Sequence, residues 1–124
     1  MQVYDSARFD PPAPLAFVTV KSSQLGLEVE NVPMLFDSGA DVTLLPRSYV
    51  ESFVSADAAH YMLEAFDGSK SVAPAVTAEL KLFGKSFHGQ FLLIDGWHGV
   101  LGRNVINHLR VVLDGPNLQW GEQR

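Results

Sequence analysis

Short apolar runs separated by turn-forming residues make up the hydrophobic and polar pattern of the chain. The runs are rich in β-branched and aromatic residues, which favour strands, and the gaps hold Gly, Pro, Asp and Asn, which favour turns. Strands are expected, in chain order, at 15–20, 27–36, 42–45, 61–66, 69–76, 77–83 and 86–94, and shorter runs at 110–113 and 118–120 flank a final turn. Pro33 should push part of the second strand toward an edge of the sheet.

Turn residues in the middle of the chain predict two successive hairpins. Asp67-Gly68 follows the fourth run, and Asp-Gly is a strong two-residue turn signal because such a turn needs positive φ. Gly84-Lys85 follows the sixth run and predicts the second hairpin. Both hairpins would add antiparallel pairs to the same sheet.

Helical spacing occurs at two places. Within 47–55, Val50, Phe53 and Val54 fall at i, i+3 and i+4, so one face can pack on a sheet. A second helix should begin after Gly102. Its buried face would consist of Val105, Ile106 and Leu109. The whole pattern predicts a mostly-β domain with one or two short helices, folded as a small closed or partly closed barrel.

Length and composition suit a single folded domain. The chain has 124 residues, of which 47% are apolar and 19% charged, so it can bury a core and is not a disordered tail. Three prolines fall within 1–14, which we expect to be an irregular, proline-rich N-terminal segment ahead of a domain at 15–124.

The net charge and the residue types present argue against several classes of partner and of cofactor. The net charge is −5 and the nine Lys and Arg are scattered singly, so nucleic acid is not expected as a partner. The start has no secretory signal, and no apolar run approaches the ~20 residues that span a bilayer, so we expect a soluble, cytoplasmic protein with no membrane partner. With no cysteine and no HExxH among four histidines, neither metal nor cofactor is expected.

One polar triplet, Asp37-Ser38-Gly39, lies between apolar runs in MLFDSGADVTLL. The three residue types favour turns, and a plain turn is one reading. A solvated turn rarely has apolar neighbours on both sides, which favours a partly buried functional carboxylate instead. The N–H of Gly39 could approach and stabilise the ionised form, and the hydroxyl of Ser38 can both donate and accept. These local features alone leave both readings open.

A second motif, GVLGRN at 99–104, contains an arginine that needs a local explanation. Arg103 stands at the start of the expected helix, where the helix dipole disfavours a cation. A carboxylate such as that of Asp41 would explain it, since guanidinium and carboxylate groups pair in a bidentate fork.

The combination of MLFDSGADVT, the Asp-Gly hairpin and VLGRNVINHL resembles the retropepsin-like aspartic proteases, the single-domain relatives of retroviral protease. The ending LRVVLDGPNLQW is also similar to that of family members, so the resemblance spans roughly 15–120. It implies an acid-protease fold for 15–124 and a twofold homodimer. It also implies hydrolysis of peptide bonds in extended polypeptides, with one aspartate from each subunit activating a water.

The resemblance assigns a role to each residue of the two motifs. Asp37 matches the catalytic aspartate, and Ser38 the residue whose hydroxyl bonds across the dimer axis, although many members have Thr there. Asp41 and Arg103 match a pair that holds the active-site loop against the helix. The residues expected to contact the substrate are Gly39, Ala40, the flap tip Phe66, Asp67, Gly68 and Ser69, and the apolar pair Val100 and Leu101.

Only one such motif is present, because the Asp-Gly pairs at Asp67, Asp95 and Asp114 lack the intervening hydroxyl residue. The second carboxylate would therefore come from a second copy of the chain. An alternative function uses the same fold without cleavage, as a dimer that binds peptides or holds a complex together. An unrelated small barrel with a chance match would instead be a monomer.

Overall fold

The computed structural model describes residues 1–65 and 67–123. Within them the strands are β1 Gln2–Val3, β2 Leu15–Ser22, β3 Leu27–Phe36, β4 Leu44–Pro46, β5 His60–Glu64, β6 Lys70–Leu82, β7 Lys85–Ile94, β8 Gly99–Leu101, β9 Val111–Asp114 and β10 Gln119–Glu122. The helices are α1 Arg47–Val50, a 3-10 turn η1 Glu51–Phe53, and α2 Arg103–Ile106. No helix in these two ranges is long and apolar enough to cross a membrane.

Six strands close into a barrel in the order β2-β3-β8-β4-β7-β6, because β6 pairs back onto β2. Alternate residues of these strands point inward and fill the barrel. The fully buried side chains include Val20, Val32, Met34, Leu45, Leu80 and Leu101. The predicted mostly-β closed barrel with two short helices is therefore confirmed.

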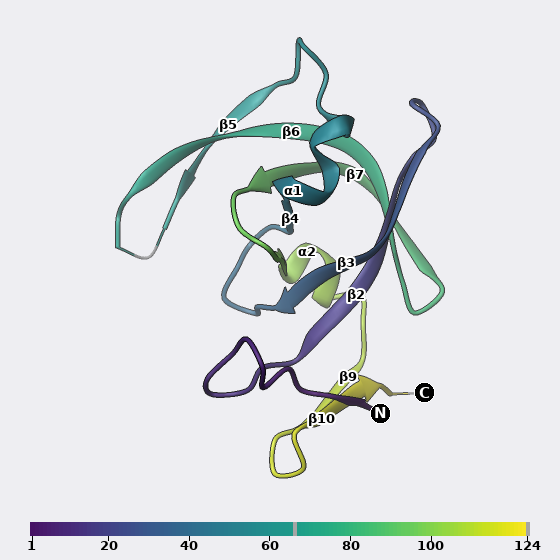
Figure 1. Cartoon of the computed structure of the whole chain (residues 1–124), viewed down its shortest axis with the longest axis vertical. Helices are drawn as coiled ribbons and strands as arrows, with labels where there is room; N and C mark the ends of the chain where they lie inside the picture. The colour runs from purple at the N-terminus through teal and green to yellow at the C-terminus, as the bar shows by residue number, and fades with distance from the viewer. Residues whose placement is uncertain (66, 124) are drawn as a thin grey trace.

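A smaller sheet, in the order β1-β10-β9, lies below the barrel and holds both chain ends (Figure 1). Trp120 of β10 joins the two sheets, since its ring packs 4.8 Å from that of Phe36 and 5.8 Å from that of Phe83. The segment 1–14 contributes β1 and a single bridge between Asp5 and Ala13, and the rest of it is irregular.

The hairpin of β5 and β6 projects from the barrel as a long arm (Figure 1). β6 continues from this arm into the barrel, where it pairs with β7 from Ala75 onward. The two strands expected at 69–76 and 77–83 are therefore one strand. Pro74 lies where the partner of β6 changes from β5 to β7. Although proline disfavours a strand interior, at this position it interrupts neither the β5–β6 ladder nor the β6–β7 ladder.

Three other sequence expectations are shifted. The second hairpin turns at Phe83-Gly84, one residue early, because both residues adopt positive φ. The helix expected at 47–55 divides into α1 and η1. The strand expected at 42–45 becomes Leu44–Pro46, since the preceding residues belong to the loop after β3.

Pro33 was expected near a sheet edge, and that expectation is confirmed. It pairs with Phe17 of β2 on one side, while pairing with β8 on the other side starts only at Met34.

Candidate active site

The loop after β3 holds Asp37 by backbone hydrogen bonds. The N–H of Asp37 donates to the carbonyl oxygen of Leu101 at 3.0 Å, and its own carbonyl accepts from the N–H of Ala40 at 3.1 Å. The N–H of Gly39 donates to Oδ1 of the carboxylate at 2.9 Å. The side chain is half-buried, so a fixed carboxylate stands at the edge of the barrel with access to solvent.

Glycines allow β8 to pass close to this loop. β8 lies between β3 and β4 and pairs with both. A Cβ at Gly99 would overlap the carbonyl oxygen of Leu44, and one at Gly102 would overlap that of Val42. Gly99 therefore lets β8 lie close to β4, and Gly102 lets the start of α2 lie close to the Asp37 loop.

Arg103 connects the loop to α2 through three contacts. Its guanidinium forms the expected ion pair with Asp41 and donates to the carbonyl oxygen of Ser38 at 2.8 Å. Its backbone N–H donates to the carbonyl oxygen of Ala40 at 2.9 Å. The Asp41 side chain is 82% exposed, so the ion pair adds little stability and mainly orients the loop.

A buried hydrogen-bond pair beneath the loop was not predicted from the sequence. The hydroxyl of Thr43, whose residue is 1% exposed, donates to Oδ1 of Asn104 at 2.7 Å and accepts from the N–H of Gly102 at 3.0 Å. The available signals were a hydroxyl residue within the apolar run VTLL and an asparagine next to Arg103. Thr43 thus joins the Asp37 loop to the start of α2 from inside.

Three of the residues expected at a flap tip, Asp67, Gly68 and Ser69, lie in a separate hairpin between β5 and β6. The carboxylate of Asp67 accepts from the N–H of Ser69 at 2.8 Å, and Gly68 has a φ of 84°. Hydrogen bonds from Ser69, side chain first and backbone second, lower the pKa of Asp67. Phe66 lies outside the described residues. Among those described, this turn makes no hydrogen bond or ion pair with the Asp37 loop.

The two apolar residues of β8, Val100 and Leu101, differ in burial. Val100 is half-buried, whereas Leu101 is fully buried in the barrel. Leu101, expected near the substrate, therefore contributes its carbonyl to the loop and its side chain to the core. Of the pair, only Val100 reaches the surface.

An apolar hollow of about 260 Å³ lies beside the loop and extends to β9. Its lining residues are Pro14, Phe36, Ser38, Ile106, Leu109, Val111 and Leu113. On the same strand, the exposed fraction of Leu113 is 56%, so apolar surface continues from Ser38 to the small sheet.

A closed barrel whose Asp-Ser-Gly loop is supported by a short strand and a short helix is the retropepsin-like fold. The solved structure of EIAV protease, complexed with the inhibitor HBY-793, superposes on the chain with a TM-score of 0.53 and 16% sequence identity. The match covers 86% of this chain and 93% of that protease, and at this identity it shows the shared fold alone. No protein-family model matches the chain. No curated protein matches it either.

Proposed function

We propose that the chain is an aspartic endopeptidase that acts as a homodimer, with Asp37 of each subunit forming the catalytic pair. The observation that carries the proposal is the half-buried carboxylate of Asp37, which is held in place by two hydrogen bonds. The backbone N–H of Asp37 donates to the carbonyl oxygen of Leu101, and the carboxylate Oδ1 accepts from the N–H of Gly39. The likeness in fold to EIAV protease supports it. A carboxylate held in this way needs little reorganisation when it meets a water and a substrate.

The chemistry requires two carboxylates around one water. Like charges brought close together cannot both ionise easily, so the pair would share one proton. The ionised aspartate takes a proton from the water, which attacks the scissile carbonyl carbon. The protonated aspartate donates its proton to the carbonyl oxygen, which gives a tetrahedral intermediate. The C–N bond of this intermediate then breaks, and the leaving amine takes up the proton that the first aspartate removed from the water. The titration would then belong to the pair of aspartates rather than to either one.

The apolar hollow between Ser38 and β9 supports the proposal that a second copy of the chain binds at this surface. Among the described strands, β9 pairs only with β10, so its other edge carries backbone groups with no strand partner in that part of the chain. Apolar side chains beside that edge would be covered by the same strand of a twofold partner. The contact would bring the two Ser38 residues, and with them the two Asp37 loops, toward the axis.

The substrate would be an extended polypeptide. Backbone groups of Gly39 and Ala40 would bond to its main chain, and the flap turn at 66–69 would close over it. Val100 would border an apolar side-chain pocket, supported by the buried Leu101 behind it.

Cleavage of a diverse peptide library across mildly acidic to neutral pH tests this function. The native chain would be compared with Asp37→Asn and with Asp57→Asn, a matched change at an exposed carboxylate in the loop before β5. Analytical ultracentrifugation would establish that each protein is dimeric at the assay concentration. At protein concentrations below the dimer dissociation constant, the cleavage rate should rise with the square of the protein concentration.

Cuts made by the native chain and by Asp57→Asn, but not by Asp37→Asn, would support the endopeptidase. An absence of cuts from a well-formed dimer would contradict it and leave a peptide-binding dimer as the better function. Cuts that persist in Asp37→Asn would exclude Asp37 as the catalytic group.

A further inference from the structure

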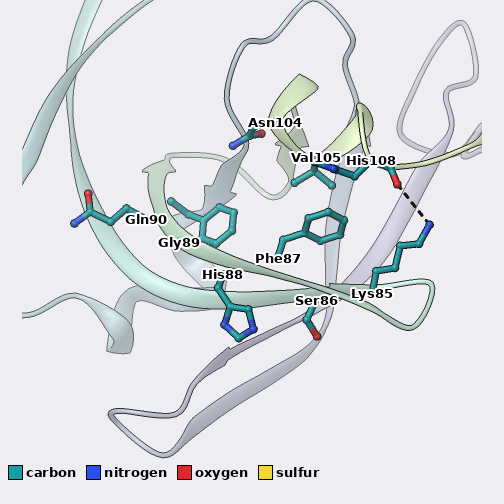
Figure 2. Close-up of a pocket in the computed structure, with 10 residues that line it drawn as sticks. Lys85, Ser86, Phe87, His88, Gly89, Gln90, Asn104, Val105 and His108 are labelled. Carbon is teal, nitrogen blue, oxygen red and sulfur yellow. Dashed lines mark hydrogen bonds between the residues drawn. The ribbon is translucent and has the colours of Figure 1, made fainter.

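A hollow of about 750 Å³ lies away from Asp37, between β7 and α2. Its walls are the stretch of β7 from Lys85 to Phe91, together with Asn104, Val105 and His108 (Figure 2). We call it the β7 groove. None of the residues proposed for catalysis or substrate binding lines it, so the β7 groove is separate from the proposed active site.

Half of β7 has an open edge along this groove. On one side β7 pairs with β6 over its whole length. On the other side β4 pairs with it only at Leu92–Ile94. The N–H and C=O groups of a strand point alternately to its two sides. Because Leu92 faces β4, the outward-facing groups before it belong to Ser86, His88 and Gln90.

The turn geometry gives the same assignment independently. Phe83 and Gly84 both have positive φ, as a two-residue type I′ hairpin requires, and such a turn is closed by a hydrogen-bonded pair, here Leu82 and Lys85. Odd-numbered residues of β7 therefore bond to β6. The backbone groups of the even-numbered residues Ser86 and His88 are left for another strand.

The side chains beside this edge offer two different faces. Phe87 points toward Val105 and His108, whereas His88 and Ser86 point the opposite way (Figure 2). Gly89 has no side chain between Phe87 and the buried Phe91, and a Cβ placed there would meet no atom within 4 Å. An apolar side chain from an added strand can therefore fill the space between the two phenyl rings.

Basic side chains line the groove within an acidic chain. Among the described residues, Lys85 is its one charged lining residue, His88 and His108 are the other basic ones, and no Asp or Glu lines it. The nearest carboxylates come from other strands: that of Glu79 on β6 lies 4.0 Å from His88, and that of Glu122 on β10 lies 3.7 Å from Lys85. The Lys85 ammonium also lies 3.5 Å from the carbonyl oxygen of His108, at the end of the groove.

We propose that the β7 groove binds an extended polypeptide segment in which acidic and apolar residues alternate, by adding it as a strand to the open edge at Ser86–Gln90. Backbone hydrogen bonds to Ser86, His88 and Gln90 would supply affinity. Apolar side chains would pack on Phe87 and in the gap at Gly89. Carboxylates would lie near Lys85, where opposite charges on adjacent strands attract.

NMR titration of the full chain tests this proposal. The protein carries Asp37→Asn so that no peptide is cut, and the probe is an end-blocked peptide of alternating Glu and Val. Amide shifts should centre on Ser86, His88 and Gln90. A peptide N-methylated at alternate residues cannot donate to the edge and should bind about tenfold more weakly or worse. A peptide with Lys in place of Glu should also lose affinity.

Two protein variants separate backbone pairing from side-chain effects. His88→Pro removes one outward N–H without removing a bond to β6, and it should abolish strand addition. His88→Gln keeps that donor and should retain most of the binding. The peptide comparisons need no substitution in the groove, so the proposal stays testable even if His88→Pro misfolds.

Equal binding of the N-methylated peptide would overturn strand addition, and equal binding of the Lys peptide would overturn the acidic partner. Shifts confined to the Asp37 loop or the flap hairpin, or no shifts at millimolar peptide, would overturn the site itself. None of these outcomes depends on whether the chain cleaves peptides.

Discussion

The hydroxyl of Thr43 makes the sharpest test of how the Asp37 loop is held. Substitution by Val keeps the shape of the side chain and removes its oxygen. Gly102 then keeps a buried backbone N–H with no acceptor, because Thr43 Oγ1 is the group it donates to at 3.0 Å. Asn104 also loses a donor at 2.7 Å, but its residue is exposed and water can replace the hydroxyl.

The expected loss follows from these two different surroundings. A buried N–H left without a partner costs about 1–3 kcal/mol, and the rehydrated Asn104 contributes little. We take about 2 kcal/mol for the fall in the free energy of unfolding. For a chain of 124 residues, an unfolding entropy of ~2.1 cal/mol/K per residue turns this into a decrease of roughly 8 °C in Tm.

Urea and thermal unfolding, followed by tryptophan fluorescence, would measure the change. Protein concentration must be held constant because the proposed dimer would contribute to the apparent stability. Thr43→Ser keeps the hydroxyl and loses only a methyl group, so it should cost about 1 kcal/mol or less. Asn104→Ala keeps the bond to Gly102 and should also be mild. If Thr43→Val unfolds like the native chain, or if Thr43→Ser costs as much as Val, the buried bond to Gly102 does not hold the loop.

Three further predictions concern the same loop and the flap. Arg103→Gln removes the ion pair with Asp41, which is exposed and adds little stability, so Tm should fall by only a few degrees. The proposed peptidase activity should fall about tenfold or more, because the ion pair orients the Asp37 loop. Thermal unfolding and peptide cleavage, measured in parallel, would show both effects. Gly102→Ala places a Cβ against a backbone carbonyl of the Asp37 loop, so it should lower the free energy of unfolding by about 3 kcal/mol or prevent folding, measured by urea titration. Ser69→Ala should raise the pKa of Asp67 toward its ordinary value of 3.8 in an NMR titration. Because folding lowers that pKa, the ionised carboxylate stabilises the flap turn above pH ~3.8, and this contribution is lost as pH falls through the folded-state pKa.

Most of the barrel could be predicted from the sequence because most of its strands carry strong local signals, whereas β8 at Gly99–Leu101 was not expected as a strand. The run at 27–36 has the same bounds as β3, and each turn contains residues that tolerate positive φ. The continuity of β6 could not be predicted. Pro74 was expected within a strand at 69–76, and only the change of partner from β5 to β7 beside it shows that this strand continues to Leu82. Local propensity does not identify the partner of a strand.

The candidate site could be predicted in part, for a similar reason. Asp37 and the pair of Asp41 with Arg103 stand out as charges in unusual settings. Thr43 does not, because its polar partner Asn104 is 61 residues away and a threonine within an apolar run is an ordinary strand residue. Burial and long-range pairing give it a role, and both are properties of the folded chain.

Two of the open strand edges among the described residues differ in the side chains beside them, so they suit different partners. The edge of β9 lies beside apolar side chains and the Ser38 loop, so a second copy can cover it and complete a site that one chain leaves half-built. The edge of β7 lies beside Lys85 and a gap between aromatic rings, and pairing with a copy of itself would add a second Lys85 to the same surface. Like charges repel, so the two proposals together predict self-association at β9 and an acidic polypeptide at β7.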